Sequence, residues 1–323
     1  LKQVMNGAYS QQDKLSHGSD RALTEALDSE MHRLNLSANQ KKIVEHLVAT
    51  EIENDYATQT DQLSLRHWDK VHCFKGADVL LPGGYKQVVE LLSKDLDIRL
   101  GKSVSAVNDR GEKIAVHTAD GGIIECDRVL VTLPLGVLKK QTVTFSPPLP
   151  DKKLESIQRL GMGVFDKLYL QFPSRFWSLD PTWIDFVGDN VKAWPVFFNV
   201  SKFSGGAILA AFNVGSFAKT LEEKSESAVV SDAMRILRKM FGADIPNPIA
   251  TKNTSWGSDP YSQGSYSYIP VGASAKDYDV LAESVNQKIF FAGEACSSKD
   301  YSTVHAAYSS GLRAARAITQ LPV

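Results

Sequence analysis

The chain has 323 residues, of which 43% are hydrophobic and 23% are charged, an ordinary composition for a globular protein with ample core. Its formal net charge of -1 provides no overall positive field, so direct binding of nucleic acid is not expected. No apolar run approaches the roughly 20 residues that a membrane-spanning helix needs, so no membrane segment is expected. The spacing of Cys73, Cys126 and Cys296 matches no zinc motif, so we expect reduced thiols, no metal site and an intracellular protein of undetermined compartment.

The first part of the chain is predicted to contain two helices. The chain begins with Leu1 and continues through polar sequence that we expect to be irregular and that has no signal-peptide pattern. From Asp20 to about Tyr56, apolar residues recur at helical spacing, and Ser37 is placed to cap the second helix.

Strands and helices then interleave to the end of the chain. Strands are expected at residues 97–100, 103–107, 113–118, 122–126, 128–132, 164–172, 182–187, 195–199, 207–212 and 288–292. Helices are expected at about 88–92, 152–160, 225–241 and 303–318. This interleaving predicts a mixed α/β (α+β) fold in two interwoven lobes.

The C-terminal strand and helix carry the clearest indication of a ligand site. The predicted strand is followed at once by Gly293 and Glu294, and a helix with many small residues begins near Thr303. Ligands of open α/β sheets bind at the carboxyl ends of strands, and helix N-termini offer unpaired N–H groups there. On these features alone, an ordinary βα unit without a ligand is the simpler interpretation.

Six segments, in the same order, resemble signatures of the flavin-containing amine oxidases. This family includes monoamine oxidases, polyamine oxidases and lysine-specific histone demethylases. The segments are 97–104, 129–139, 145–150, 160–167, 256–268 and 290–313, the last containing Phe290-Phe-Ala-Gly-Glu294, Thr303-Val-His-Ala-Ala307 and Ser310-Gly-Leu-Arg313. The resemblance covers almost the whole chain from about Leu63, and six signatures in order make it specific.

The resemblance implies the two-lobed fold of that family, with FAD as the cofactor. Segments at about 75–163 and 275–323 would form the FAD-binding lobe, and segments at about 1–74 and 164–274 would form the substrate-binding lobe. The family normally begins with a strand, a Gly-x-Gly-x-x-Gly turn and a helix that hold the dinucleotide, and these are absent from the sequence. We therefore expect the chain to be a fragment that lacks its N-terminal dinucleotide-binding segment.

The resemblance also assigns roles to individual residues. Catalytic roles fall to Lys167, which would hold a water against flavin N5, to Tyr266, which would orient the amine, and to Thr303, which stands where monoamine oxidases have a second aromatic residue. Cofactor-binding roles fall to Val104, Thr132, Leu133, Pro134, Trp256, Tyr261, Ser265, Tyr266, Gly293, Glu294, Ser302, Thr303, Val304 and Ala307.

The residues themselves leave simpler alternatives open. Lys167 lies on a predicted strand between apolar neighbours, where burial would lower its pKa, but a solvated lysine on a sheet face is the simpler interpretation. Trp256 and Tyr261 can also serve as core aromatics. Acidic residues such as Asp55, Asp61 and Asp69 are candidates for pairing with a second substrate nitrogen, although solvated surface charge explains each of them too.

The implied reaction is hydride transfer from an amine to flavin N5, giving an imine and then an aldehyde, with dioxygen reoxidising the flavin to form hydrogen peroxide. The expected partners are a small amine and dioxygen. We favour a polyamine-type substrate, because the acidic run that follows the His-Trp-Asp motif in histone demethylases is replaced by Lys70–Lys75, which is neutral to basic. A peptidyl-lysine (histone) demethylase that binds a histone tail is the first alternative, and a non-catalytic binding module derived from a flavoprotein is the second.

Overall fold

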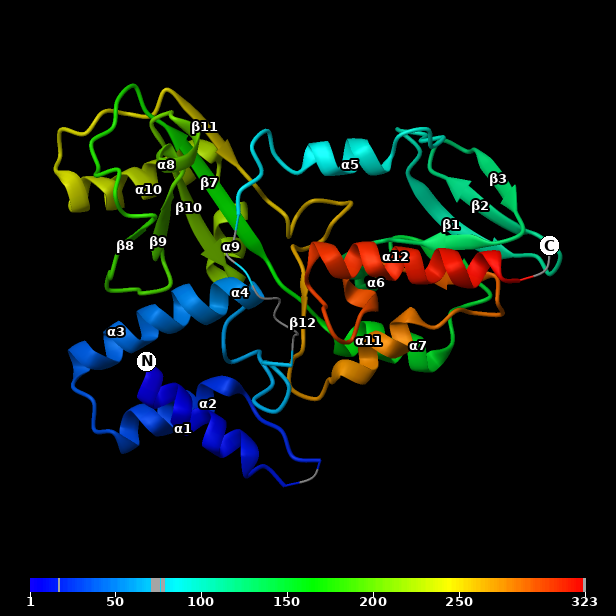
Figure 1. Cartoon of the computed structure of the whole chain (residues 1–323), viewed down its shortest axis with the longest axis horizontal. Coiled ribbons are helices and arrows are strands. Elements are labelled where there is room, and N and C mark those ends of the chain that lie inside the picture. The colour runs from blue at the N-terminus through cyan, green and yellow to red at the C-terminus, as the bar shows by residue number, and fades with distance from the viewer. Residues whose placement is uncertain (17, 71–75, 77–78, 322–323) are drawn as a thin grey trace.

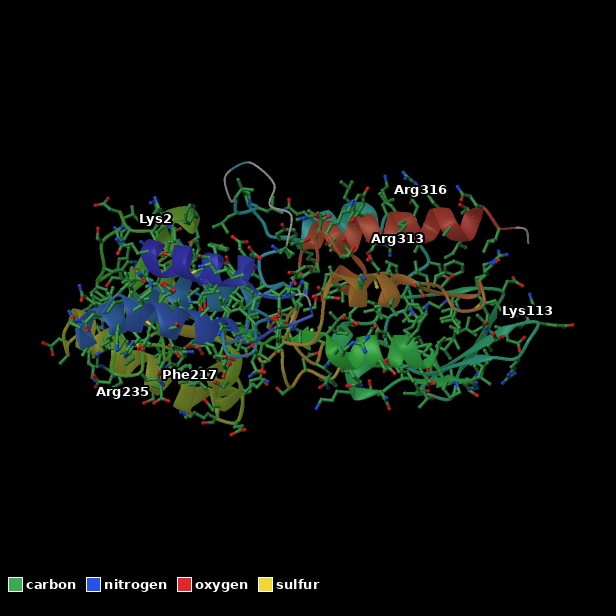
Figure 2. All side chains as sticks on the ribbon, turned by 90° about the horizontal axis from the view of Figure 1, so that it is seen from below. Lys2, Lys113, Phe217, Arg235, Arg313 and Arg316 are labelled. Carbon is green, nitrogen blue, oxygen red and sulfur yellow. The ribbon has the colours of Figure 1, made fainter. Side chains whose placement is uncertain are left out.

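The computed structural model describes residues 1–16, 18–70, 76 and 79–321, and it places them in two lobes that lie side by side (Figure 1). One lobe carries the N-terminal helices and the sheet that contains β7, and the other carries β1 to β5 with the C-terminal helix. Seen from below, Phe217 marks the first lobe, and Arg313 and Arg316 mark the second (Figure 2). The fold is therefore mixed α/β, as the sequence predicts. The predicted lobe limits have no independent test and stay a prediction.

The N-terminal helices pack together around one apolar cluster. They are α1 (Lys2–Asp13), α2 (Leu23–Arg33), α3 (Ala38–Val48), the π-helical turn η1 (Ala49–Glu53) and α4 (Asn54–Tyr56). Ser37 caps α3 as predicted, because its Oγ accepts a hydrogen bond of 3.3 Å from Gln40 N. The expectation of an irregular start is wrong. Helix α1 buries only Val4 and Ala8, one turn apart, which is too sparse an apolar pattern to recognise in polar sequence.

A five-stranded antiparallel sheet forms the other half of this lobe. Its strand order is β11 (Ala250–Asn253), β7 (Phe165–Gln171), β10 (Ile208–Val214), β9 (Val196–Asn199) and β8 (Trp183–Asp185). Helices α8 (Ser201–Ser204), α9 (Gly215–Glu222) and α10 (Glu226–Phe241) accompany it. Leu168 and Leu170 of β7 pack with Val229 and Leu237 of α10 in one buried cluster. The residues of β7 that alternate with Leu168 and Leu170 therefore point the opposite way, toward the interior of the molecule between the lobes.

The second lobe combines a mixed four-stranded sheet with two short pairs of strands. The sheet has the order β3 (Ile123–Cys126), β2 (Ile114–Thr118), β1 (Val104–Asp109) and β5 (Thr144–Ser146), and its strands are antiparallel except for the parallel neighbours β1 and β5. The first pair is β4 (Val129–Val131) with β13 (Ile289–Phe291), which are parallel, and the second is β12 (Ser267–Tyr268) with β6 (Gly161–Met162), which are antiparallel. The accompanying helices are α5 (Lys86–Leu92), α6 (Leu135–Lys140), α7 (Asp151–Arg159), α11 (Ala275–Ala282), η2 (Glu294–Cys296) and α12 (Val304–Thr319).

One expectation for this lobe is wrong. Residues 97–100 do not form a strand, because no neighbouring strand in the described part of the chain pairs with their backbone, and Ile98 and Leu100 are exposed. Helix α12 buries its small residues Ala306, Ser310 and Ala314, whereas larger apolar residues of the helix face water. Val304, Tyr308 and Leu312 are 59%, 53% and 42% exposed. Close approach of the helix backbone to the lobe decided which face is buried.

None of the helices in the described ranges is long and apolar enough to cross a membrane.

Lys153 on α7 ties two helices of this lobe together. It is only 2% exposed, and its Nζ donates to the carbonyl oxygens of Val280, Leu281 and Glu283 at 2.8, 2.7 and 2.7 Å. These carbonyls lie at and just beyond the C-terminal end of α11, where backbone donors become scarce, so the ammonium group completes the helix terminus.

We predict that Lys153→Met lowers the free energy of unfolding by about 2 kcal/mol or more, because it strands buried carbonyl groups without a donor. Urea denaturation measures the loss. Lys152→Met is the matched control, because the Lys152 side chain is 64% exposed and its ion pair with Glu283 contributes little. Equal stability of the two variants would contradict this role for Lys153.

Candidate active site

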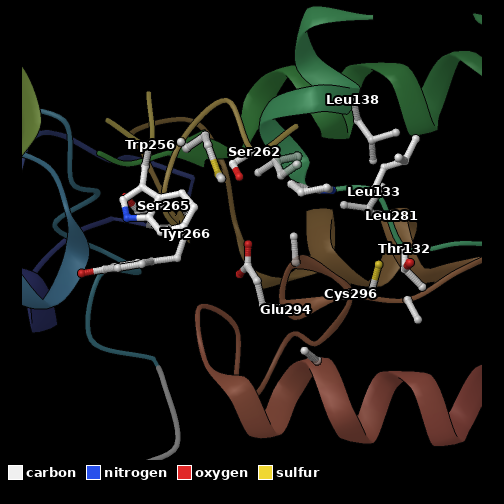
Figure 3. Close-up of a pocket in the computed structure, with 18 of the residues that line it drawn as sticks. Thr132, Leu133, Leu138, Trp256, Ser262, Ser265, Tyr266, Leu281, Glu294 and Cys296 are labelled. Atoms are coloured by element: carbon white, nitrogen blue, oxygen red, sulfur yellow. The ribbon is translucent and has the colours of Figure 1, made fainter. Parts of the chain in front are cut away.

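The carboxyl ends of the parallel strands β4 and β13 open into a cavity of about 410 Å³, which we call the first cavity. A cavity of this size at this edge of an α/β sheet is typical of a small-molecule or cofactor site. Its walls come from both strand ends, β6, β7, the segment 256–266 and α12 (Figure 3). The lining residues that the sequence predicted are Thr132, Leu133, Pro134, Lys167, Trp256, Ser265, Tyr266, Gly293, Glu294 and Ala307.

One end of the first cavity is aromatic. The side chains of Trp256 and Tyr266 lie near each other there, and the Phe165 ring meets Tyr266 edge-on at 6.3 Å between centroids (Figure 3). The Tyr266 hydroxyl donates to Asn54 O at 2.7 Å, and burial raises the pKa of this phenol. Flat aromatic walls of this kind suit a planar ring or a cationic amine.

Lys167 reaches the same end of the cavity from β7. The strand alternates, so Lys167 shares one face with Phe165 and Tyr169, while Asp166 and Leu168 are buried on the other face. Its Nζ lies 5.1 Å from the centroid of Phe165 and 5.3 Å from that of Phe212, within the range of cation–π attraction. Burial lowers the pKa of Lys167, so the partly buried lysine that the strand pattern suggested is present. Its catalytic role stays a prediction.

Glu294 organises the middle of the cavity. Its carboxylate accepts hydrogen bonds from Ser267 N at 3.2 Å, Ser267 Oγ at 2.7 Å and Ser302 N at 2.8 Å. Burial raises its pKa, although these three bonds oppose the effect. The carboxylate therefore joins β12 to the turn before α12. Beside it, Gly293 has a φ of 140° that favours glycine, and open space lies where a side chain would project.

The far end of the cavity is lined by Thr132, Leu133, Leu281 and Cys296 (Figure 3). Burial raises the pKa of the Cys296 thiol to about 12, so at neutral pH it is a neutral, poorly nucleophilic group. Cys126 is a free, half-buried thiol, and Cys73 lies outside the described residues. The described residues contain no cluster of His, Cys, Asp or Glu side chains that could hold a metal ion.

A second cavity of about 560 Å³ adjoins the first, and Phe165 and Tyr266 line both. The remaining walls come from the end of α3, η1, α4 and the strands β8 to β10. Three acidic residues line this second cavity, namely Glu51, Asp55 and Asp185. His46 Nε2 lies 2.9 Å from Asp185 Oδ1 and anchors that carboxylate to α3.

Five predicted residues lie elsewhere. Ser302 lines the second cavity rather than the first. Thr303 caps α12 by accepting from Ala306 N at 3.1 Å and lines neither cavity. Tyr261 and Val304 are 68% and 59% exposed. Val104 lies at the start of β1, packed against the core of the second lobe. Their proposed contacts with a cofactor stay predictions.

Sequence reasoning missed two contributors to the site. Phe165, which lines both cavities, has no predicted role. Asp166, which is 3% exposed, holds Trp256 N at 3.0 Å through its carboxylate. The position of this Asp in a strand of alternating apolar residues is the signal that could have identified it, because a buried carboxylate requires a hydrogen-bond partner.

The sequence pattern of the family described as flavin containing amine oxidoreductase matches residues 25–319. The chain belongs to this family. Its cofactor is therefore FAD, and oxidoreductase chemistry follows at the level of the family. Three plant proteins also resemble the chain. It is 42% identical over 79% of its length to Lysine-specific histone demethylase 1 homolog 3 of Arabidopsis thaliana and 35% identical over 95% of its length to homolog 1 of Oryza sativa subsp. japonica. It is 37% identical over 85% of its length to Protein FLOWERING LOCUS D of Arabidopsis thaliana.

The matched part of the chain spans only 17% of the first of these relatives, 37% of the second and 36% of the third.

The residues of the first cavity fit a flavin. Trp256 and Tyr266 provide the flat wall, Gly293 leaves room beside the backbone, and Ala307 keeps α12 close without filling the space. These residues would hold the isoalloxazine and its attached chain in this FAD-dependent family.

We predict that Glu294→Gln lowers the free energy of unfolding by about 2 kcal/mol. The side-chain NH2 group of glutamine would face the hydrogen-bond donors of Ser267 or Ser302, so a hydrogen bond would be lost there. We also expect FAD affinity to fall at least tenfold, because the wall of the first cavity shifts. Urea denaturation and quenching of FAD fluorescence measure the two effects. Glu125→Gln is the control, because its side chain is 62% exposed on β3. Unchanged stability in the Glu294 variant would refute the bridging role.

Proposed function

We propose that this chain forms the flavin-facing and substrate-binding part of an enzyme that oxidises a cationic amine. The observation that carries the proposal is the pair of adjoining cavities that share Phe165 and Tyr266. One cavity fits a flavin and contains Lys167, and the other is acidic and aromatic. When bound, FAD accepts a hydride from the carbon beside the amine nitrogen, and dioxygen restores it with formation of hydrogen peroxide.

The second cavity is suited to an amine with more than one polar or charged group. Glu51 and Asp55 approach it from the helical side, and Asp185 approaches from β8. These carboxylates attract a cation, while the rings of Phe165 and Phe212 offer π faces to it. The reacting nitrogen itself must be neutral so that its lone pair can assist hydride loss. The partly buried aromatic junction between the cavities favours that neutral form, because aromatic rings solvate a charge less well than water does.

Lys167 is placed to move or hold a proton beside the flavin. Its lowered pKa makes a neutral amine accessible, and a neutral amine accepts a proton or a hydrogen bond from water. Tyr266 limits the substrate's approach, because its hydroxyl is fixed to Asn54 O and its ring therefore cannot swing freely.

The first candidate substrate is a methylated lysine side chain on a basic peptide such as a histone tail. Similarity to relatives named as lysine-specific histone demethylase homologues supports it. A polyamine is the second candidate, because three carboxylates from separate elements match a chain that carries several positive charges. The segment 71–75, whose neutral to basic character favoured a polyamine, lies outside the described residues.

Anaerobic titration of the FAD-loaded protein tests the proposal. We expect the visible flavin band to bleach on addition of a dimethyl-lysine peptide and to recover in air with release of peroxide. Bleaching by spermine alone would select the polyamine instead. A protein that retains FAD and is bleached by neither amine would refute amine oxidation and support a binding module.

We predict that Lys167→Met slows flavin reduction, its reoxidation by dioxygen, or both, at least tenfold, because the only cation at this wall of the described first cavity is removed. Stopped-flow absorbance measures the two half-reactions separately. Lys252→Met on β11 is the control, since that lysine is exposed and lines neither cavity. If both half-reactions keep their rates to within twofold, Lys167 has no such role.

A further inference from the structure

We propose that Asp166 and Glu222 act as one acid pair that shares a single proton and thereby fixes Trp256 in the wall of the first cavity. The assignment of that wall to a flavin site rests on the proposed function. The acid pair and its hold on the backbone do not. Both residues are positioning residues, because neither lines the first cavity.

Asp166 connects β7 to the segment that carries Trp256. Its Oδ1 accepts from Thr254 Oγ1 at 2.9 Å and from Trp256 N at 3.0 Å. Thr254 is itself bound to the next residue of β7. Lys167 N donates to Thr254 Oγ1 at 2.9 Å, and Thr254 N donates to Lys167 O at 3.0 Å. The positions of Lys167 and Trp256 are therefore coupled through this carboxylate.

Glu222, at the end of α9, holds the next amide of the same segment. Its Oε1 accepts from Gly257 N at 2.7 Å, so two carboxyl groups bind two consecutive backbone N–H groups. A Cβ at residue 257 would lie 2.9 Å from Glu222 Oε1, so a side chain there would push the Glu222 carboxyl away from this amide.

A shared proton explains the remaining oxygen of Asp166. Its Oδ2 is buried and has no hydrogen-bond partner among the described residues. Two ionised carboxylates that bind consecutive backbone amides repel each other, whereas one proton shared between them turns repulsion into a strong bond. Burial, and then the hydrogen bond with Glu222, raise the pKa of Asp166 to about 7. At lower pH the pair holds its proton and both anchors are in place.

No cation that would replace the proton is bonded to either carboxyl in the described part of the chain. The residue opposite Asp166 on β10 is the neutral Asn213, and the Nζ of Lys167 lies over aromatic rings. On the outer side, Glu222 borders a cavity of about 500 Å³ whose other charged residues are Lys139, Lys140, Lys219 and Glu223.

The direction of the pH effect follows from linkage. A carboxyl whose pKa is raised by folding binds its proton more tightly in the folded state than in the unfolded state. Its contribution to stability is complete below the ordinary aspartate pKa of about 4 and is lost as the pH rises to about 7. Above that pH the second negative charge loosens the hold on Trp256 and Gly257.

Hydrogen exchange of the 254–264 segment, followed by mass spectrometry from pH 5 to pH 9 and corrected for intrinsic rates, tests this inference on the FAD-free chain. We expect protection of the Trp256 and Gly257 amides to fall at least tenfold as the pH passes through about 7. Asp166→Asn and Glu222→Gln should remain protected throughout, because an amide donates the hydrogen that the shared proton supplies.

The matched control is Glu223→Gln, which changes an exposed neighbour and should keep the pH-dependent loss. Asp166→Ala should be unprotected at every pH. Constant protection in the unmodified chain, or an unchanged transition in either amide variant, would overturn the shared proton. If one amide variant does not fold, the other decides the result. The exchange measurement does not require bound FAD. A chain that fails to retain FAD would therefore contradict the proposed function without affecting the test of the acid pair.

Discussion

The site depends on one geometric constraint, the alternation of side chains along β7. Successive residues of a strand point to opposite faces, so Lys167 can enter the first cavity only if Asp166 turns into the protein. A buried carboxylate is costly without partners, and the chain supplies them from the segment that carries Trp256. The same strand thus places a cation at the first cavity and stabilises the aromatic wall of that cavity.

The two cavities differ in charge although they share a wall. Around the first cavity, the carboxylate oxygens of Glu294 accept hydrogen bonds from other residues of the protein. The environment offered to a large cofactor is therefore one of small and apolar groups. Around the second, acidic side chains come from helices and from β8. Under the proposed function, a cationic substrate would be drawn to the acidic side and would meet the cofactor at the aromatic junction formed by Phe165 and Tyr266.

Much of the fold could be predicted from sequence, for particular physical reasons. The long amphipathic helix α10 and the strand β7 have clear periodicities, and the family signatures collected most residues of the first cavity. Helix α1 was missed because few of its residues are buried, and β11 was missed because it is a short, exposed edge strand. The acid pair could not be predicted, because Asp166 and Glu222 are brought together only by tertiary packing.

The outward face of α12 has a consequence for the behaviour of the chain in solution. Val304, Tyr308 and Leu312 follow one another at successive turns and remain in water, and Val89 and Leu91 of α5 are also exposed. The attraction between such apolar surfaces is largely entropic near room temperature and weakens on cooling. Any association of the chain through these helices is therefore favoured by warmth and high salt and reversed in the cold, opposite to an association held by ion pairs.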